Sequence, residues 1–256
     1  MKNPLRLGKK LYRATLARSP RTRYEARFSL LHELASDWGF PLYTFNLAWP
    51  DDEQFLRVWR DFPARDVPTH DRKFVLYSLA RSVATLAGDS AECGVLAGAS
   101  SHLMCSALAR PGRVHHVFDS FAGLSEPGAE DEPSAEHTFR WQKHDLARPL
   151  EQVRRNLARF PFVEYHPGWI PERFADVAAS RFAFVHVDVD LYRPTRDSLE
   201  FFYPRLVPGG VLLCDDYGST ACPGARRAFD ELMVGKPDGS VVHLPTGQGF
   251  IIKRGA

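Results

Sequence analysis

Apolar residues recur along the chain with two different periods. From residue 71 the stretch DRKFVLYSLARSVATLA places its apolar side chains along one helical face, which predicts a helix over 71–87. The stretch FAFVHVDVD is instead rich in β-branched and aromatic residues, which predicts a buried strand over 182–190. The two patterns alternate as far as VVHLPTGQGFIIKR, which predicts two strands around a turn over 241–254.

This alternation indicates an α/β fold. Strands separated by helices pair in parallel with helices on both faces of the sheet, whereas the last two strands are expected to form an antiparallel hairpin. We therefore predict a doubly wound, Rossmann-like, mostly parallel sheet. The other predicted strands are 90–94, 113–119, 163–167 and 209–216, and the other predicted helices are 100–110, 149–160, 195–206 and 221–232.

Length and charge limit the organisation and the partners. A chain of 256 residues suits one α/β domain with an extension, so we predict a helical N-terminal extension over 1–66 and a main domain over 67–256. Basic residues dominate residues 1–28, but the net charge of +2 is too near balance to favour nucleic acid as a partner.

The composition also predicts the cellular compartment. No apolar stretch approaches the roughly 20 residues of a membrane span, and the first residues lack the pattern of a secretory signal. The cysteines are scattered without a C-x-x-C pair, which predicts reduced core thiols rather than disulfides or a zinc site. We therefore expect a soluble, cytoplasmic protein. The cysteines are Cys93, Cys105, Cys214 and Cys222.

Acidic residues follow four of the predicted strands. One acid beyond an apolar strand is usually a helix cap or a solvated turn. Ligands of open α/β sheets, however, bind beyond the carboxyl ends of the strands, where these acids would meet and repel one another without a cation or hydrogen-bonding ligand. We therefore predict a binding site there. The acids are Glu92, Asp119, Asp188, Asp190, Asp215 and Asp216.

The loop AECGVLAGAS, residues 91–100, follows the first predicted strand. It matches neither G-x-G-x-x-G nor the P-loop, whereas Asp119 lies at the separation from which an acid holds ribose hydroxyls. A nucleoside-containing cofactor is therefore expected. The loop favours S-adenosylmethionine over a dinucleotide, because Glu92 would repel a pyrophosphate but can pair with an amino group, while backbone N–H groups near Ser100 can bind a carboxylate.

Several stretches together resemble one family. AECGVLAGASS, VFDSFAGL, PGWIPERF, FAFVHVDVDLYRPTRDSLEFFYPRLVPGGVLLCDDYG and GQGFIIKR are similar to the macrocin-type sugar O-methyltransferases, which include the macrocin, mycinamicin and novobiocin enzymes. The resemblance covers about residues 67–254, and the D-x-D-L-Y stretch followed by G-G and D-D-Y-G is its most specific part. It implies a class I S-adenosylmethionine-dependent methyltransferase that binds Mg²⁺ and methylates a sugar hydroxyl.

The resemblance also implies residue roles. It assigns Asp188, Asp215 and Asp216 as metal ligands, and residues 1–66 to the acceptor lid and to subunit contacts in a homo-oligomer. Three carboxylates suit Mg²⁺ better than zinc, and Asp188 is our candidate for the group that accepts the hydroxyl proton. The implied cofactor contacts are Thr69, Glu92, Cys93, Gly94, Gly98, Ser100, Asp119, Ser120, Gly168 and Trp169.

Some alternatives stay open. Val189 stands where the family usually has glycine, and residues before about 65 match nothing in the family. The identity of the acceptor, a small glycoside or a polysaccharide, is therefore not inferred from the resemblance. A metal-dependent methyltransferase of catechols or other phenols needs the same acids, and a non-catalytic nucleoside-binding protein could keep them. Asp190 is expected to hydrogen-bond its loop and His186 to be structural. The alternative bases are His70, His137 and His144.

Overall fold

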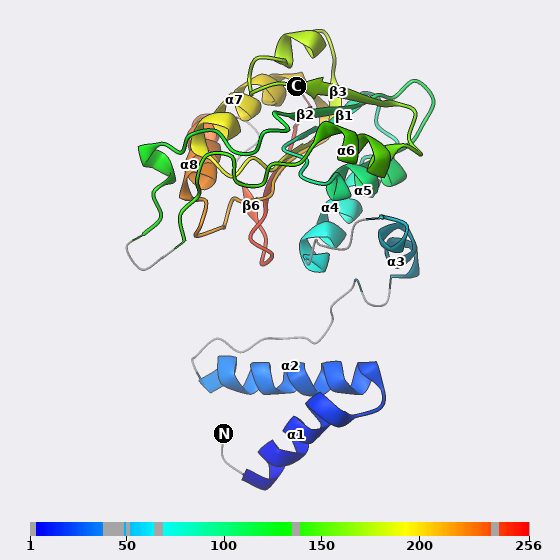
Figure 1. Cartoon of the computed structure of the whole chain (residues 1–256), viewed down its shortest axis with the longest axis vertical. Coiled ribbons are helices and arrows are strands. Elements are labelled where there is room, and N and C mark those ends of the chain that lie inside the picture. The colour runs from blue at the N-terminus through cyan, green and yellow to red at the C-terminus, as the bar shows by residue number, and fades with distance from the viewer. Residues whose placement is uncertain are drawn as a thin grey trace. The chain divides into compact units, whose positions relative to one another are not determined.

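The structure, a computed structural model, describes residues 4–37, 49, 52–63, 69–134, 139–236 and 241–255. The chain divides into two compact units, residues 1–51 and 52–256 (Figure 1). In the first unit, helices α1 (Pro4–Leu16) and α2 (Pro20–Asp37) pack against each other, and Arg27 Nε donates to the carbonyl of Ala14 over 2.9 Å. No described helix in either unit has the length and apolar character needed to cross a membrane.

The second unit is built on a seven-stranded sheet with the order β3-β2-β1-β4-β5-β7-β6. The first five strands pair in parallel, and β6 and β7 complete the sheet in antiparallel pairing. This confirms the predicted doubly wound sheet with its C-terminal antiparallel hairpin. The strands are β1 (Asp89–Cys93), β2 (His115–Asp119), β3 (Val163–Pro167), β4 (Phe182–Val187), β5 (Leu206–Cys214), β6 (Val242–His243) and β7 (Gly249–Ile252).

Helices cover both faces of this sheet. One buried cluster joins α5 and α6 to β2, and a larger one joins α7 and α8 to the central strands (Figure 1). Helix α3 is anchored on α4, because the fully buried ring of Phe55 packs edge-on against Phe74 with centroids 5.3 Å apart. The helices are α3 (Glu53–Arg60), α4 (His70–Ser82), α5 (Ala99–Leu108), α6 (Leu150–Leu157), α7 (Tyr192–Phe202) and α8 (Pro223–Met233), with 3₁₀ turns at Ala129–Asp131, Phe174–Val177 and Tyr203–Arg205.

The central strand β4 is shorter than predicted. It ends at Val187 rather than at residue 190, so the two aspartates of V-D-V-D lie in the following loop. Leu191 N–H donates to the carbonyl of Val189 over 2.6 Å, and Asp190 has a left-handed φ of 59°. This tight turn ends the strand and directs the two acidic side chains separately.

Candidate active site

A cavity of about 630 Å³ lies at the carboxyl ends of the parallel strands. Ligands of doubly wound sheets bind in this place, because adjacent loops diverge where the strand order reverses. The order here reverses between β1 and β4, and the cavity is lined from both sides of that point. Its lining includes Asp119 after β2, Asp188 and Asp190 after β4, and Asp215 and Asp216 after β5.

The loop after β1 requires glycine at position 94. Gly94 has a left-handed φ of 79°, and a Cβ there would lie 1.9 Å from the carbonyl oxygen of Asp188. Gly94 N–H also donates to the carbonyl of Phe118 over 2.9 Å. The loops after β1 and β4 and the end of β2 therefore meet at Gly94, and these contacts fix the floor of the cavity.

Asp119 braces this floor. Its Oδ2 accepts a hydrogen bond from Val95 N–H over 2.8 Å, and its Oδ1 accepts one from Phe121 N–H over 2.7 Å. Burial raises the pKa of Asp119, and the backbone hydrogen bonds oppose that rise. The carboxylate thus ties the loops after β1 and β2 together while it lines the cavity, which is the position of a ribose-binding acid in this type of fold.

Glu92 is buried behind the cavity and does not line it. Its carboxylate accepts hydrogen bonds from the Ser101 hydroxyl and, over 2.9 Å, from His186 Nδ1. Burial alone would raise the pKa of Glu92, but the contacts with His186 and Ser101 hold it below the ordinary value. Burial alone would lower the pKa of His186, but its contacts with Asp215 and Glu92 raise it to about 9. This imidazole is therefore cationic at neutral pH.

Asp215 and Asp216 are held by Arg72, at the start of α4. One guanidinium nitrogen of Arg72 lies 2.6 Å from Asp215 Oδ2 and 3.0 Å from Asp216 Oδ1. Asp215 Oδ1 also accepts hydrogen bonds from Gln248 over 2.6 Å and from His186 Nε2 over 3.2 Å. Burial alone would raise the pKa of Asp215, but the charges of Lys73, His186 and Arg72 hold it well below its usual range.

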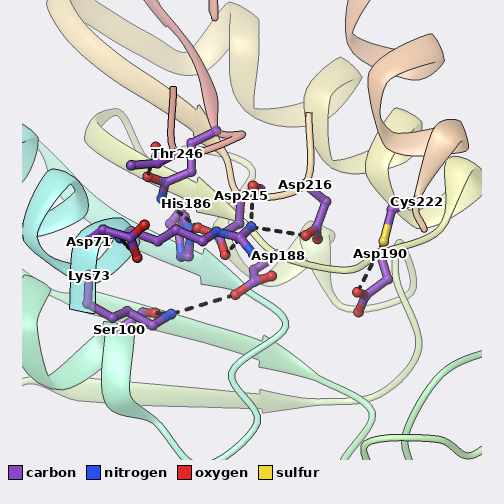
Figure 2. A network of polar contacts seen from close by, with 12 residues as sticks. Asp71, Lys73, Ser100, His186, Asp188, Asp190, Asp215, Asp216, Cys222 and Thr246 are labelled. Atoms are coloured by element: carbon purple, nitrogen blue, oxygen red, sulfur yellow. Dashed lines mark hydrogen bonds and ion pairs between the residues drawn. The ribbon is translucent and has the colours of Figure 1, made fainter. Parts of the chain in front are cut away.

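Asp188 is held less tightly than Asp215 and Asp216. Its closest cation, Lys73 Nζ, lies 4.0 Å from Oδ2 and donates a hydrogen bond to the Ser100 hydroxyl (Figure 2). Burial and repulsion from Asp215 and Asp216 raise the pKa of Asp188. With 27% of its side chain exposed, Asp188 can meet a ligand in the cavity directly.

Asp190 lies apart from this group, beside Cys222 (Figure 2). The Cys222 thiol donates to Asp190 Oδ1 over 3.6 Å and accepts from Trp141 Nε1 over 3.3 Å. Burial and repulsion from Asp188 raise the pKa of Asp190 to about 7. The hydrogen bond links Asp190 to the segment before α8, in line with a structural role.

Some carboxylate oxygen atoms of the cavity are not engaged in short contacts and could bind a hard cation. Among the described residues, Asp216 Oδ2 is buried without a hydrogen-bond partner, and the ion pair between Asp188 and Lys73 is long, at 4.0 Å. Carboxylate oxygens are the donors that Mg²⁺ prefers. Asp215 would join them only if the Arg72 guanidinium moved, because that group now fills its coordination. Ligand atoms within 4.8 Å of one another form two neighbouring sets, His186–Asp188–Asp215 and Asp190–Asp216–Cys222.

The residues expected to contact the cofactor fall into two groups. Those that line the cavity are Thr69, Gly94, Asp119, Ser120 and Trp169. The others support these from behind: Gly98 caps α5 with a left-handed φ of 89°, and Gly168 N–H donates to the carbonyl of Asp119 over 3.0 Å. This second group comprises Glu92, Cys93, Gly98, Ser100 and Gly168.

Sequence reasoning missed Arg72 and Lys73, the cations that face the cavity carboxylates. Two adjacent basic residues at the start of the apolar helix predicted over 71–87 are the signal that could have indicated them. It also missed Trp141, Arg193 and Asp197, which line the cavity from loops and from α7. Nothing in their local sequence pattern distinguishes them from surface residues.

Two of the three histidines predicted as alternative bases are described, and neither lines the cavity. His70 Nε2 accepts a hydrogen bond from Trp59 Nε1 over 3.0 Å. His144 Nδ1 lies 2.9 Å from the carbonyl of Ala122. Neither lines the cavity, and His137 lies outside the described residues.

The chain was compared with known families and proteins. The family model described as Macrocin-O-methyltransferase (TylF) matches residues 76–234. A tetracenomycin-C rhamnosyl 4'-O-methyltransferase from Streptomyces olivaceus is 40% identical over 151 residues, 56% of this chain and 58% of that protein. The mycinamicin III 3''-O-methyltransferase of Micromonospora griseorubida is 33% identical over 56% of this chain and 60% of its own length. The matched segment thus spans somewhat more than half of each relative.

Solved structures show the same architecture. The O-methyltransferase NovP superposes with a TM-score of 0.59 at 28% identity, over 72% of this chain and 79% of that one. The calicheamicin methyltransferase CalS11 superposes with a TM-score of 0.61 over 81% of this chain and 94% of that one, and its 18% identity supports likeness of fold alone.

Proposed function

The chain belongs to the macrocin O-methyltransferase (TylF) family, and from this premise we propose that it transfers a methyl group from S-adenosylmethionine to a sugar hydroxyl, with Mg²⁺ bound beside the acceptor. The observation that carries the proposal is the convergence of strand-end carboxylates on one cavity. Asp119 lies on one side of the switch point and Asp188, Asp215 and Asp216 lie on the other. This separation leaves one end for a nucleoside and the other for a cation and an acceptor.

The cofactor end is formed by the loops after β1, β2 and β3. Asp119 is placed to hold ribose hydroxyls, and Trp169 offers a ring against which an adenine can stack. The loop after β1 lines the cavity at Gly94, Val95 and Leu96, just before α5, and the positive end of that helix dipole would favour the methionine carboxylate nearby. Because the carboxylate of Glu92 is hydrogen-bonded to His186 and Ser101, we propose that it positions the cofactor-binding loop after β1 and does not contact the cofactor itself.

The acceptor end is formed by the loops after β4 and β5. When bound, S-adenosylmethionine supplies an electrophilic methyl group and Mg²⁺ lowers the pKa of the acceptor hydroxyl. Asp188 and Asp216 would hold the cation, because both have oxygen atoms without a tight partner, and Asp215 would join them when Arg72 moves aside. The acceptor oxygen would gain the methyl group and lose its proton, and Asp188, which lines the cavity, is our candidate to take that proton.

The lining near Asp188 supports a sugar as the acceptor. Trp141 offers an aromatic face, and Arg193 and Asp197 offer a charged donor and an acceptor for hydroxyl groups. The relatives are named for methyl transfer to glycosylated natural products, including a rhamnosyl tetracenomycin. We therefore propose a natural-product glycoside as the acceptor class.

The proposal extends to cellular location and assembly. The four cysteines are free and buried, as expected for a protein of a reducing compartment, so we propose that the enzyme works in the cytoplasm. Self-association stays a prediction.

The test is methyl transfer with purified protein. A panel of rhamnosides and other deoxysugar glycosides is incubated with S-adenosylmethionine and Mg²⁺, and the acceptor's gain of one methyl group is followed by mass spectrometry. We expect transfer that EDTA abolishes and added Mg²⁺ restores. Asp188→Asn and Asp216→Asn should abolish transfer, whereas Glu151→Gln, on the exposed face of α6, should leave it unchanged.

Each part of the proposal has its own contrary result. Full activity in EDTA would refute the role of the metal. Methylation of vicinal phenols without methylation of glycosides would refute the sugar acceptor. Tight binding of S-adenosylhomocysteine with no transfer to either class would indicate a protein that binds the cofactor without using it.

A further inference from the structure

A second group of potential metal ligands lies outside the cavity, on strands β2 and β3. Its members are His116, Glu164 and His166, none of which lines the cavity. The parallel register pairs His116 with Glu164 and Phe118 with His166. Because side chains two positions apart in a strand share a face, all three project from the same face of the sheet.

The distances within this group match those of a bound ion. His116 Nδ1 lies 3.1 Å from His166 Nε2 and 3.7 Å from Glu164 Oε2, and all three ligand atoms lie within 4.8 Å of one another. In tetrahedral zinc sites, bonds of about 2.0–2.2 Å separate neighbouring ligand atoms by roughly 3.3–3.6 Å. The two printed distances lie within a few tenths of an ångström of that spacing, so small side-chain shifts would bring the three atoms around a zinc ion.

A carboxylate faces the outer nitrogen of each imidazole. His166 Nδ1 lies 3.2 Å from Asp176 Oδ2, and His116 Nε2 lies 3.5 Å from Asp89 Oδ2. Arg173 holds Asp176 over 2.7 Å, so that carboxylate is itself fixed. Metal-binding histidines usually donate their second ring N–H to such a carboxylate, which turns the other nitrogen toward the metal.

Packing fixes the rings, and one side stays open to solvent. The ring of His166 stacks on Phe118 with centroids 4.4 Å apart, and that of His116 meets Phe182 edge-on at 5.9 Å. Burial lowers the pKa of His166, and the contact with Asp176 opposes that change. The Glu164 side chain is 60% exposed, so an ion can enter from its side.

We propose that His116 Nδ1, His166 Nε2 and Glu164 Oε2 form a binding site for Zn²⁺, with solvent water in the fourth position. Imidazole ligands select a transition metal over Mg²⁺. The ion would link β2 to the edge strand β3, which leads into the Gly168–Trp169 turn of the cavity wall. The proposal is independent of the methyl-transfer reaction.

Zinc binding to the whole, metal-stripped protein tests this site. Zn²⁺ is titrated against a chromophoric zinc chelator in excess Mg²⁺, which competes for the carboxylates of the cavity. We expect one zinc per chain. Asp176→Asn should weaken binding by about 10–100-fold, as for other partners of ligating histidines, and Glu164→Gln should weaken it at least as much. The matched control is Glu172→Gln, an exposed carboxylate four residues before Asp176 in the chain.

Further variants decide between this site and its alternatives. Zn²⁺ should raise the melting temperature of the wild type but not that of His166→Asn. If His166→Asn does not fold, the two carboxylate variants decide, because neither removes a buried ring. Wild-type affinity in both carboxylate variants, loss of zinc in Asp216→Asn, or no zinc bound at micromolar concentration would each overturn the proposal and leave a histidine pair that only shares a proton.

Discussion

Replacing Gly94 by alanine tests the geometry of the cavity floor. The new Cβ would lie 1.9 Å from the carbonyl oxygen of Asp188, about 1 Å inside the 3.0 Å limit of real Cβ contacts. A left-handed φ costs an alanine about 1–2 kcal/mol, and overpacking typically costs a further 1–3 kcal/mol or so. We expect the free energy of unfolding to fall by about 2–5 kcal/mol in total.

Gly112 supplies the matched control. Its φ of 77° is almost the same as that of Gly94, but among the described residues, its two chain neighbours aside, no atom lies within 4 Å of the position that a Cβ would occupy. Gly112→Ala should therefore lose only about 1–2 kcal/mol, the cost of the backbone conformation alone. Urea denaturation of the two variants measures the difference, which is the cost of the clash.

The same substitution should also impair the site. The clash pushes on the backbone of Asp188, and a shift of about 1 Å at a reacting group can cost on the order of 10²-fold in rate. Gly112→Ala should retain wild-type transfer. Equal destabilisation of the two variants would refute the close approach of the loops after β1 and β4 on which the site depends.

Three further substitutions or conditions test the charges around the site. Arg72→Met should tighten Mg²⁺ binding roughly tenfold, about 1.4 kcal/mol, because it removes the cation that competes for the cavity carboxylates. Calorimetry measures this affinity, and equal or weaker binding would contradict the prediction. Glu92→Gln should lower the free energy of unfolding by about 1.5–3 kcal/mol, because it weakens a charged hydrogen bond to the buried His186. An unchanged midpoint of urea denaturation would argue against the Glu92–His186 hydrogen bond. Burial lowers the pKa of His115 to about 4, so between pH 6.5 and about 4 this imidazole is protonated in the unfolded chain but stays neutral in the folded protein. The free energy of unfolding should therefore fall by up to about 1.4 kcal/mol per pH unit as the pH drops through this range. His115→Gln should flatten this slope, and an identical slope would refute the assignment.

Much of the fold could be predicted from local patterns. The periods of apolar residues identified the alternating elements, because burial of one face imposes a period of 3.6 on a helix and a strand exposes its residues alternately. The acids at the strand ends located the site, since parallel strands end at one edge of a sheet. The prediction failed at the end of β4, where the turn around Asp190 ends the strand three residues early.

The partners of these residues depended on the tertiary structure. Glu92 is predicted to contact the cofactor. The order of the strands places it next to His186 of β4, whose Nδ1 donates a hydrogen bond to its carboxylate. Arg72 lies more than a hundred residues before the two carboxylates that it holds. Charged side chains of this kind carry no period in the sequence that could indicate their partners.

The amino-acid sequence by itself determined the α/β class, the glycine-dependent loop and the acids of the cavity, because each follows from backbone preference or from local periodicity. Only the tertiary structure decided which charges meet, including Arg72 with Asp216 and His116 with His166. The two histidines are 50 residues apart and become neighbours through the register of β2 and β3. That register is set by packing of the whole sheet, which no local pattern encodes.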